Sequence, residues 1–495
     1  MSGDMATTSA NNTEFAAIVL AAGKSTRMRS KLPKALHPVC GKPILAHILD
    51  ALAGAGVTRR VVIIGHEGDT VRRTLDDRYG ADALQYAEQT VQKGTGHATQ
   101  MAEPLLASHK GIVLVLPGDT PLLSSDSLRR LLETHISRGA AATLLTTVLP
   151  HDAGSYGRVL RDADDLVTGI VEARDATPEQ KAVREINTSV YAFSAPSLFR
   201  ALRDLRPDNA QGELYLTDVI QLLRQAGETV AAEVTSDPDI VLGVNTRVEL
   251  AEINAKMRTR LLHDLMLSGV TITDPATTYV EAGVTVGQDT TILPGTHLLG
   301  DTHIGEDCVI GPNAVITETT IGDRVVLRLS LADHAIVGDD SRIGPFSHLR
   351  PGTRLGKGVR IGNFVETKAA VLEDGVSANH LTYLGDATIG AKTNIGAGTI
   401  TCNYDGYQKS RTNIGANTFI GTNSTLVAPV TVGNDAFTAA GSVITDNVPD
   451  GAFAVARSRQ SVKEGWVQAR REKQMQARMA SQGSAQAEKG EGSGR

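Results

Sequence analysis

The sequence is poor in cysteine and in aromatic residues. Three cysteines occur among the 495 residues, and they stand far apart at Cys40, Cys308 and Cys402. An odd number at this spacing excludes a disulfide scaffold and a Cys-x-x-Cys metal site. Aromatic residues account for 4% of the chain, whereas glycine occurs 49 times. This balance favours a repetitive architecture with tight corners over a large core built from aromatic rings.

An excess of positive charge and long hydrophobic runs are also missing. The net charge is −6, which excludes a global basic surface for nucleic acid. No stretch approaches the roughly 20 apolar residues of a membrane span, and the first 15 residues contain no Lys, no Arg and no apolar run. We therefore expect a cytoplasmic protein with no secretory signal, no membrane span and no nucleic-acid partner. The 41% of hydrophobic residues suffice to bury real cores.

The first half of the chain predicts an α/β domain. Bare apolar runs begin at Phe15, Val61 and Ile112, as in strands that are buried on both faces of a sheet. An amphipathic stretch, residues 43–52, lies between the first two runs. Strands and helices that alternate at this spacing form βαβ units around a mostly parallel sheet. Ligands bind such sheets at the carboxyl ends of the strands, so the loops there are the places to search.

The second half has a different period. Aliphatic residues recur every six positions in four runs, at Val286, Ile292, Leu298, Ile304, Ile310 and Ile316, at Val337, Ile343, Leu349, Leu355 and Ile361, at Ile389 and Ile395, and at Ile414, Ile420, Leu426 and Val432. This spacing is typical of a parallel β-helix, in which each hexad forms one face of a triangular coil. We expect the aliphatic side chains to point inward and to stack from coil to coil. Glycine follows many of them, and we expect it to supply backbone freedom at the corners.

A connecting helix and a polar C-terminal region complete the predicted organisation. Leu250, Ile253, Met257, Leu261 and Leu265 are spaced by three or four residues, which predicts an amphipathic helix. The polar residues after the β-helix predict a short surface helix and a disordered tail. The expected segments are a flexible N-terminal tail (1–13), an α/β domain (14–246), a linker helix (247–268), a β-helix domain (269–457) and the C-terminal helix with its tail (458–495).

A turn of small residues, 20–23, directly follows the first predicted strand. The adjoining Lys24 is reminiscent of a P-loop, but Ile18 stands where that loop requires glycine, and a GxGxxG pattern is absent as well. The remaining interpretation is a turn whose backbone N–H groups face a nucleotide, with Lys24 and Arg27 supplying charge for phosphate. Lys34 follows in Leu-Pro-Lys-Ala-Leu, where a surface lysine is the alternative to a functional one.

Further motifs continue this pattern along the chain. They are Ala87-Glu-Gln89, Lys93-Gly-Thr-Gly-His-Ala98, Pro117-Gly-Asp119, Tyr156-Gly-Arg158, Ile170-Val-Glu172, Glu185-Ile-Asn187 and Gly243-Val-Asn245. Together with the hexads they closely resemble the bacterial family of bifunctional N-acetylglucosamine-1-phosphate uridyltransferases and glucosamine-1-phosphate N-acetyltransferases. The resemblance covers residues 16–457. It implies an α/β Rossmann-like nucleotidyltransferase domain followed by a left-handed parallel β-helix.

In the first half, the resemblance implies a uridyltransferase site that uses Mg²⁺ and UTP. Catalytic roles are implied for Arg27, Lys34 and Asp119, and metal binding for Asp119 and Asn245. Mg²⁺ prefers such oxygen ligands, although Asp119 alone could also be a turn former before Thr-Pro. Ser25 departs from the glycine that is frequent in the family. The residues implied to bind UTP or UDP-N-acetylglucosamine are Leu20, Ala21, Ala22, Gly23, Lys34, Gln89, Gly94, Thr95, Pro117, Gly118, Asp119, Gly157, Glu172, Asn187 and Asn245, with Gln89, Gly94 and Thr95 at the uracil and Gly157, Glu172 and Asn187 at the sugar.

In the second half, the repeat carries more polar residues than a plain coil requires, and residues 401–412 break its period. The resemblance implies that His380 is the general base of acetyl transfer from acetyl-CoA, because a neutral imidazole can take a proton near pH 7. Glu366 could support the charge balance, and Lys409 is a weaker phosphate candidate. The sugar-phosphate contacts implied are Arg350, Lys368, Tyr383 and Asn394. The acetyl-CoA contacts implied are Ala397, Asn403, Tyr404, Thr422, Ala440 and Arg457, of which Thr422 departs from the more usual serine.

Three functions remain to be weighed on the sequence. The leading one is an enzyme that acetylates glucosamine 1-phosphate and then uridylates N-acetylglucosamine 1-phosphate, as a homotrimer with acyl sites between subunits. The first alternative is a single-activity nucleotidyltransferase for another sugar, such as an ADP-glucose or mannose-1-phosphate enzyme, with the coil as a stalk. The second is a regulatory or scaffold subunit, which would be expected to have lost Asp119, Lys34 or Asn245. All three residues are present, which favours an enzyme.

Overall fold

The computed structural model describes residues 14–23, 26–209 and 211–490. The expected flexible tail, residues 1–13, lies outside the described residues, as do Lys24 and Ser25. The chain divides into two compact units, Met1–Lys357 and Gly358–Arg495, and each is described by itself.

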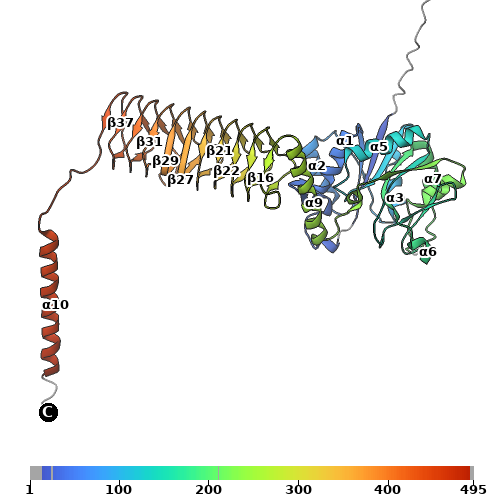
Figure 1. Cartoon of the computed structure of the whole chain (residues 1–495), viewed down its shortest axis with the longest axis horizontal. Coiled ribbons are helices and arrows are strands. Elements are labelled where there is room, and N and C mark those ends of the chain that lie inside the picture. The colour runs from blue at the N-terminus through green and yellow to red at the C-terminus, as the bar shows by residue number, and fades with distance from the viewer. Residues whose placement is uncertain (1–13, 24–25, 210, 491–495) are drawn as a thin grey trace, which may run out of the picture. The chain divides into compact units, whose positions relative to one another are not determined.

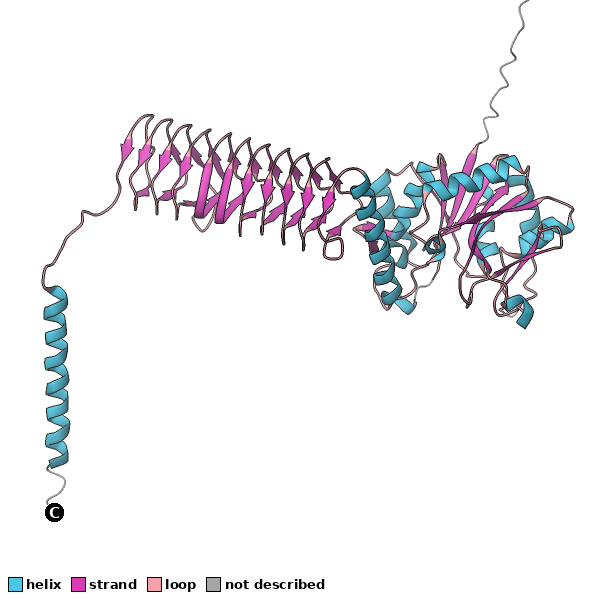
Figure 2. Cartoon of the chain, in the orientation of Figure 1, coloured by secondary structure: helices cyan, strands magenta, loops and turns pink. Residues whose placement is uncertain are grey.

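The N-terminal part of the first unit is built on a mixed sheet of nine strands (Figure 2). The main path runs β11-β7-β10-β6-β1-β4-β5, and β8 and β9 form a hairpin on β10. β1 pairs in parallel with both β4 and β6, whereas β10 runs antiparallel to β6 and β7. The strands are β1 (Phe15–Leu20), β4 (Arg59–Ile64), β5 (Gln85–Glu88), β6 (Ile112–Pro117), β7 (Ala142–Val148), β8 (Arg158–Arg161), β9 (Val167–Val171), β10 (Glu185–Ser194) and β11 (Val230–Thr235), besides the small hairpin β2 (Pro38–Val39) and β3 (Lys42–Pro43).

Helices cover both faces of this sheet (Figure 1). Alternate residues of β1 belong to different hydrophobic cores, Ala17 and Val19 to one and Ala16 and Ile18 to the other. This explains the bare apolar runs of the sequence, because each strand must be apolar on both sides. The helices are α1 (Ile44–Gly54), α2 (Gly68–Tyr79), α3 (Thr95–Gln100), α4 (Glu103–Leu106), α5 (Ser125–Ser137), α6 (Pro178–Lys181), α7 (Ala195–Arg203) and α8 (Asp218–Gln225), with 3₁₀ turns at η1 (Thr26–Met28), η2 (Lys34–Leu36) and η3 (Pro238–Val241).

The order of the strands fixes the place where a ligand can bind. The chain passes from β1 to β4 and β5 on one side, and then returns to the other side of β1 with β6. Leu20 and Pro117, the last residues of β1 and β6, are paired in register. The loops that follow them therefore leave the sheet side by side at a topological switch point, which is the usual ligand site of open α/β sheets.

The predicted connecting helix is α9 (Arg247–Leu267), and it begins with a capping box between Thr246 and Glu249. It buries Ile253, Met257 and Leu262, and the other predicted residues, Leu250, Leu261 and Leu265, are half-buried. The first coils also join this unit, because Arg258 of α9 lies 4.4 Å from the ring of Tyr279 and Ala282 N–H donates to the Cys40 carbonyl at 3.0 Å. The compact units divide at Lys357, and the expected segments divide at other positions.

The remainder of the first unit is a left-handed parallel β-helix of short strands. Ile292 pairs with Ile310 and Leu298 pairs with Ile316, so each hexad residue stacks on its equivalent one coil along. The predicted inward residues are buried, except for the half-buried Val286 in an early coil. The strands are β12 (Thr271–Ile272), β13 (Tyr279–Val280), β14 (Thr285–Val286), β15 (Thr291–Ile292), β16 (His297–Leu299), β17 (His303–Ile304), β18 (Val309–Ile310), β19 (Val315–Thr317), β20 (Thr320–Ile321), β21 (Val326–Leu327), β22 (Leu331–Asp333), β23 (Ile336–Val337), β24 (Arg342–Ile343), β25 (His348–Leu349) and β26 (Arg354–Leu355).

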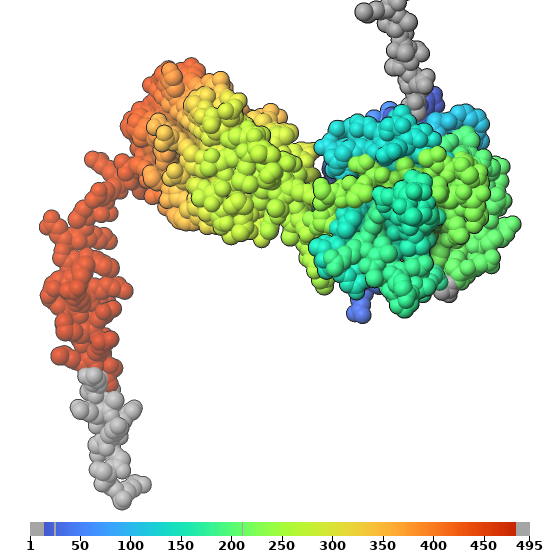
Figure 3. Space-filling model, turned by 45° about the vertical axis from the view of Figure 1, so that its right-hand side comes forward, coloured from blue at the N-terminus to red at the C-terminus, as the bar shows by residue number. Residues whose placement is uncertain are grey.

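The expected reason for the glycines in the repeat is wrong at most positions. A Cβ on Gly287 would lie 2.6 Å from the carbonyl carbon of Gly305 in the next coil, and neither glycine has a positive φ. Left-handed angles fall instead two residues after such a glycine, as at Asp289 and Asp307. Glycine is therefore required because successive coils pack in direct contact. Figure 3 shows one outer face of these coils.

The second unit continues with coils of the same kind and two longer strands. β27 (Arg360–Lys368) and β29 (Ser377–Gly385) each span nine residues and pair in parallel. Residues 403–411 leave the coil between β32 and β33, where the sequence loses its period. The other strands are β28 (Val371–Leu372), β30 (Ala387–Ile389), β31 (Asn394–Ile395), β32 (Ile400–Cys402), β33 (Thr412–Ile414), β34 (Phe419–Ile420), β35 (Thr425–Val427), β36 (Val430–Val432), β37 (Phe437–Thr438), β38 (Val443–Ile444) and β39 (Phe453–Ala454).

The C-terminal helix is longer than the short helix expected from the sequence. α10 spans Trp466–Gly490, 25 residues, and leaves only the last five positions outside the described residues. The segment is rich in Ala, Gln, Glu, Lys, Arg and Met, which are strong helix formers. This local preference outweighs the low hydrophobicity on which the expectation of a disordered tail rested. No helix in the described parts of the chain is both long enough and apolar enough to cross a membrane.

Candidate functional site

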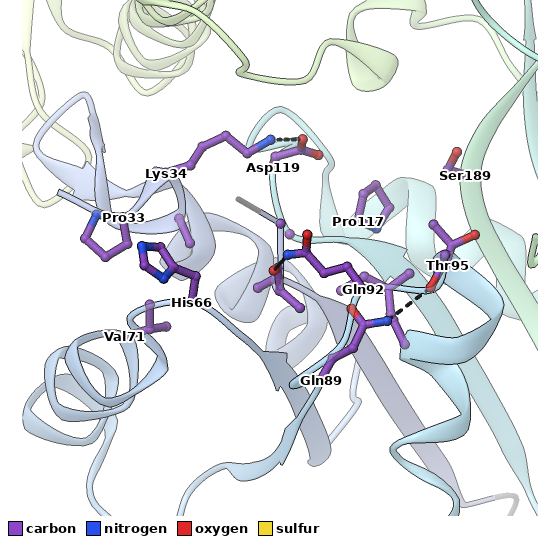
Figure 4. A pocket seen from close by; sticks show the side chains of 18 of the residues that line it. Pro33, Lys34, His66, Val71, Gln89, Gln92, Thr95, Pro117, Asp119 and Ser189 are labelled. Atoms are coloured by element: carbon purple, nitrogen blue, oxygen red, sulfur yellow. Dashed lines mark hydrogen bonds and ion pairs between the residues drawn. The ribbon is translucent and has the colours of Figure 1, made fainter. Parts of the chain in front are cut away.

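A cavity of about 590 Å³ opens at the carboxyl ends of β1 and β6 (Figure 4). Of the predicted nucleotide-site residues, those that line it are Leu20, Ala21, Ala22, Gly23, Lys34, Gln89, Gly94, Thr95, Pro117, Gly118, Asp119 and Glu172. Arg27, Gly157, Asn187 and Asn245 are not among the residues that line the cavity. Residues separated by more than 150 positions therefore meet at one switch point, as the strand order requires.

The turn after β1 is held by its neighbours. The backbone N–H of Ala21 donates to Ile63 at 2.9 Å, and that of Gly118 donates to Leu20 at 2.9 Å. A Cβ on Gly65 would lie 2.6 Å from the carbonyl oxygen of Ala22. The turn is thus fixed from both sides of β1, which leaves its backbone pre-organised for a ligand. The predicted phosphate contact Lys24 and the substituted Ser25 lie outside the described residues.

Lys34, Asp119 and Asn245 form a charged cluster at the rim. Lys34 Nζ lies 2.6 Å from Asp119 Oδ2 and donates to Asn245 Oδ1 at 3.2 Å. Arg27 Nη2 donates to the same amide oxygen at 3.0 Å. The backbone supports this geometry, because Val244 N–H donates to the Asp119 carbonyl at 3.0 Å. The two predicted metal ligands therefore converge on one point, together with the cationic groups of Arg27 and Lys34.

This cluster fits Mg²⁺ on the chemistry of its donors. The Asp119 carboxylate and the Asn245 amide oxygen already share one cation, the Lys34 ammonium, and both are the hard oxygen ligands that Mg²⁺ requires. Among the residues that the structure describes, no group of three or more His, Cys, Asp and Glu side chains could hold a metal. A site with two protein ligands suits an ion that completes its shell with substrate phosphates and water.

The predicted uracil contacts lie on the loop between β5 and α3. Gln89 Nε2 donates to the Gly94 carbonyl at 3.2 Å and lies 3.0 Å from His97 Nδ1. Gly94 has a φ of 103°, and a Cβ there would meet Leu214 O at 2.5 Å. Thr95 Oγ1 accepts from Leu216 N–H at 3.1 Å. These bonds fix the orientation of the Gln89 amide. That orientation would decide which hydrogen-bonding groups of a nucleotide base the amide can pair with.

Of the predicted sugar contacts, Glu172 lines the cavity, and Asn187 bonds to a further lining residue, Tyr191. Asn187 N–H donates to Gly157 O at 2.9 Å, and its Nδ2 donates to the Tyr191 hydroxyl at 2.7 Å. Burial raises the pKa of Glu172, and the Thr217 hydroxyl beside it acts in the opposite direction. Burial also raises the pKa of Tyr191, against hydrogen bonds from Asn187 and Ser189. The wall thus offers a connected set of polar groups suited to sugar hydroxyls.

The sequence alone missed several lining residues. Gln92 Nε2 donates to the Ala22 carbonyl at 2.6 Å, and so ties the β5–α3 loop to the phosphate turn. Its signal was available, because it stands between Gln89 and Gly94 in a stretch already assigned to the base. His66, Glu67, Ser189 and Thr217 also line the cavity, but they lie outside the quoted motifs, and only the fold brings them to it.

In the second unit, the candidate acyl-transfer residues lie along β27 and β29. His380 stands opposite Asn363 and Tyr383 stands opposite Glu366 in the parallel register. His380 is exposed, and its backbone carbonyl accepts from the Thr382 hydroxyl at 2.7 Å. These two strands are the longest in the coil, so they present a continuous edge on which several polar side chains can line up.

A basic group forms where the excursion 403–411 returns to the coil. Lys368 Nζ lies 4.0 Å from Asp386 Oδ2, and Asn403 Nδ2 donates to the same carboxylate. The pKa of Lys409 is lowered, first by its contact with Lys368 and by that lysine's charge, whereas Asp386 and Tyr383 act in the opposite direction. Two lysines brought together in this way form a site suited to an anion such as phosphate.

The remaining candidates follow the corners of the coil. Asn394 pairs with Ser377 in the neighbouring coil. A Cβ on Gly396 would lie 2.6 Å from the backbone nitrogen of Thr422, and a Cβ on Gly421 would lie 2.6 Å from that of Ala440. Ala397, Thr422 and Ala440 therefore mark one corner over successive coils. Tyr404 is 60% exposed and forms an isolated bridge with Lys409, and Arg457 is exposed after the last strand. Arg350 belongs to the first unit, directly after β25 (His348–Leu349).

The fold and the cavity define a two-domain transferase, with a nucleotidyltransferase domain and a hexapeptide coil. The family model described as the MobA-like NTP transferase domain matches residues 17–216, and the bacterial transferase hexapeptide (six repeats) matches residues 283–318, 334–369 and 411–446. The bifunctional protein GlmU of Exiguobacterium sibiricum is 48% identical over 447 residues, which are 90% of this chain and 98% of that protein.

Two further relatives bear the same name. The bifunctional protein GlmU of Lactococcus lactis is 46% identical over 449 residues, which are 91% of this chain and 97% of that protein. The bifunctional protein GlmU of Heliobacterium modesticaldum is 49% identical over 451 residues, which are 91% of this chain and 97% of that protein. The chain belongs to the GlmU family of bifunctional proteins and is an enzyme with two transferase domains.

Proposed function

We propose that this enzyme makes UDP-N-acetylglucosamine in two steps. The β-helix domain transfers acetyl from acetyl-CoA to the amine of glucosamine 1-phosphate. The α/β domain then transfers the uridylyl group of UTP to N-acetylglucosamine 1-phosphate and releases pyrophosphate. The family model for an NTP transferase over residues 17–216 and the hexapeptide model support this pair of activities.

The observation that carries the uridylyl step is the convergence of Lys34, Asp119, Asn245 and Arg27 beside the cavity. A phosphate oxygen of the sugar 1-phosphate attacks the α-phosphorus of UTP, and pyrophosphate leaves with the bonding electron pair. No covalent enzyme intermediate is needed. Lys34 and Arg27 neutralise the charge that develops on the phosphoryl oxygens, and the pre-organised turn holds the nucleotide in line.

Mg²⁺ is the metal that we assign to Asp119 and Asn245. When bound, it supplies positive charge at the phosphates. The two side chains also hold Lys34 in place through their bonds to its ammonium group. Asp119 thereby orients the Lys34 ammonium group.

For the acetyl step we assign the role of general base to His380. The substrate amine attacks the thioester carbonyl carbon, the coenzyme A thiolate leaves, and His380 removes the proton from the nitrogen. Lys368, Tyr383, Asn394 and Arg350 are assigned to the sugar phosphate. The acetyl-CoA contacts are assigned to Ala397, Asn403, Tyr404, Thr422, Ala440 and Arg457. The anion-binding character of the Lys368 and Lys409 group supports a phosphorylated acceptor.

The proposed partners are small molecules and copies of the same chain. UTP and acetyl-CoA are co-substrates, with glucosamine 1-phosphate and N-acetylglucosamine 1-phosphate as acceptors. The exposed position of His380 on a regular coil supports a homotrimer in which an adjacent subunit completes the acyl site. We also propose a cytoplasmic location, which these substrates support.

Separate assays of the two half-reactions test the proposal. Mass spectrometry follows UDP-N-acetylglucosamine formed from N-acetylglucosamine 1-phosphate, UTP and Mg²⁺, and N-acetylglucosamine 1-phosphate formed from glucosamine 1-phosphate and acetyl-CoA. Both products are expected. If only the first forms, the coil is a stalk and the enzyme has a single activity. If ADP-glucose or GDP-mannose forms in preference from ATP or GTP and the matching sugar phosphate, the assigned substrates are wrong.

A further inference from the structure

Ser189 lines the cavity and has an unusual backbone. It lies within a strand, yet its backbone adopts a left-handed conformation. Its φ is 61°, an angle that few residues other than glycine, Asn and Asp adopt. It lies within the strand β10 (Glu185–Ser194), and its side chain is exposed in the cavity wall. A strained residue that persists at a cavity indicates a functional requirement, provided that its surroundings hold it there.

The surroundings of Ser189 do hold it. The register between β10 and β7 shifts between Asn187 and Tyr191, which takes the intervening residues out of the ladder. Asn187 Oδ1 accepts from Ser189 N–H at 3.1 Å. Thr188 Oγ1 accepts from Val190 N–H at 3.3 Å and donates to a backbone carbonyl of β7 at 2.7 Å. Side chains on this strand thus form hydrogen bonds with the backbone N–H groups that have left the ladder. The resulting bulge turns one residue, Ser189, toward the cavity.

The bulge belongs to the wall that carries the predicted sugar contacts. Asn187 bonds to Gly157 through its backbone and to the Tyr191 hydroxyl through its amide, and Tyr191 itself lines the cavity. Figure 4 shows Ser189 on the side of the cavity away from Lys34 and Asp119. The phosphates are assigned to Lys34 and the sugar to the Glu172 side of the cavity, so we expect the sugar ring to lie within reach of Ser189.

We propose that Ser189 is a specificity-determining residue of uridylyl transfer, and that its hydroxyl forms a hydrogen bond with a hydroxyl or N–H group of the sugar. This inference rests on the proposed function. A serine hydroxyl provides one donor and two acceptor positions, so it can bond to the sugar while it also bonds to Tyr191. Because the bulge fixes the backbone before the substrate arrives, the hydroxyl is already in position and little ordering is required on binding.

Steady-state kinetics of uridylyl transfer test the inference, with N-acetylglucosamine 1-phosphate and UTP varied separately. The proteins compared are the wild type, Ser189→Ala, Ser189→Gly and Ser137→Ala, a matched control at the exposed end of α5. Ser189→Ala is expected to raise KM for the sugar phosphate about fivefold, as loss of one neutral hydrogen bond does, and to leave KM for UTP unchanged. Ser189→Gly relieves the backbone strain, and we expect the same rise in KM with no decrease in the unfolding temperature.

Two results would overturn the inference. One is a KM for the sugar phosphate in Ser189→Ala within twofold of the wild type. The other is an equal rise of KM for the sugar phosphate and for UTP, which indicates that the residue serves only the shape of the cavity. The wild-type arm separates this failure from that of the proposed function, because a wild-type protein that forms no UDP-N-acetylglucosamine refutes the proposed function, and the role of Ser189 with it.

Discussion

In the first unit, the candidate residues come from loops after several strands and converge on a cavity of about 590 Å³. In the second unit, they lie in rows along β27, β29 and the corners of the coil, and His380 and Tyr404 are exposed. The α/β sheet gathers distant loops at one edge through its topology. A β-helix instead repeats the same outward positions from coil to coil, and gathers side chains only where a loop leaves it.

Because of this difference, the two regions need different additions before they can catalyse a reaction. The cavity of the first unit and the charged cluster at its rim already combine cations, oxygen ligands and a fixed turn, so this site needs only substrate and the proposed metal. The coil presents the proposed base, His380, and the proposed anion site on its surface and needs a further wall, which the proposed trimer would supply. The two activities should therefore be separable by single substitutions.

The largest effect is expected for His380→Ala. Removal of the base should lower kcat of acetyl transfer by about 10²- to 10⁴-fold. Uridylyl transfer to N-acetylglucosamine 1-phosphate should stay within twofold, since His380 belongs to the second unit. Coenzyme A release and pyrophosphate release measure the two reactions separately. His303→Ala, which changes an exposed coil histidine of the first unit, is the control and should affect neither reaction.

Asp119→Asn should produce the reciprocal result. The change keeps the shape but removes the charge that binds Lys34 and the proposed metal. Uridylyl transfer is expected to fall by about 10²-fold or more, while acetyl transfer is unchanged. Chelation of Mg²⁺ should act in the same direction. Asp126→Asn, on the exposed start of α5, controls for the loss of one charge, and a similar loss in that variant would argue against a specific role for Asp119.

Lowering the pH should destabilise the first unit more than the second. Burial lowers the pKa of His47 and of His135 to about 4, below the unfolded value of about 6.5. The unfolded chain then binds more protons, so stability contributed by these histidines is complete above about pH 6.5 and is lost as the pH falls toward 4. Each contributes up to about 3 kcal/mol to the free energy of unfolding. His380 is the single histidine after Lys357.

Hydrogen exchange measured by mass spectrometry at pH 7 and at pH 5 tests this expectation, after correction for the intrinsic rate. Amides of residues 14–246 should lose protection at pH 5, and amides of β27 to β39 should retain it. His135→Gln, which removes the titrating group, should reduce the pH dependence of the first region. An equal loss of protection in both regions would contradict the expectation that buried histidines make the first region more sensitive to acid.

The smallest effect is expected for the coil glycines. A Cβ on Gly415 would lie 2.5 Å from Asn434 N in the next coil, whereas a Cβ on Gly451 meets nothing within 4 Å, although its φ is 64°. Gly415→Ala should cost about 2–3 kcal/mol in the free energy of unfolding, and Gly451→Ala about 1 kcal/mol. Denaturant titration compares the two. Equal costs would contradict our account of the repeat as directly packed coils.

Much of the fold was predictable because its signals are local. Bare apolar runs marked β1, β4 and β6, and the hexads marked the buried residues of the coil. The small-residue turn and Asp119 could also be located, since both directly follow a strand. The family resemblance supplied the pairing of Asp119 with Asn245, which spacing along the chain does not reveal.

The rest could not be predicted because it depends on tertiary contacts. The bulge that exposes Ser189 requires a register shift between β10 and β7, and no residue type at that position signals a left-handed backbone. The role of the hexad glycines depends on the distance between coils rather than on their own φ. α10 extends further than expected because helix propensity was given too little weight against low hydrophobicity.

The central claim is that two separate sites carry out the two half-reactions in sequence. A complementation assay tests this most directly, with glucosamine 1-phosphate, acetyl-CoA, UTP and Mg²⁺ as starting materials. His380→Ala alone and Asp119→Asn alone should each yield almost no UDP-N-acetylglucosamine, with N-acetylglucosamine 1-phosphate accumulating in the second case. A mixture of the two purified proteins should restore the product. No recovery on mixing, although each variant retains its own half-reaction, would contradict the account.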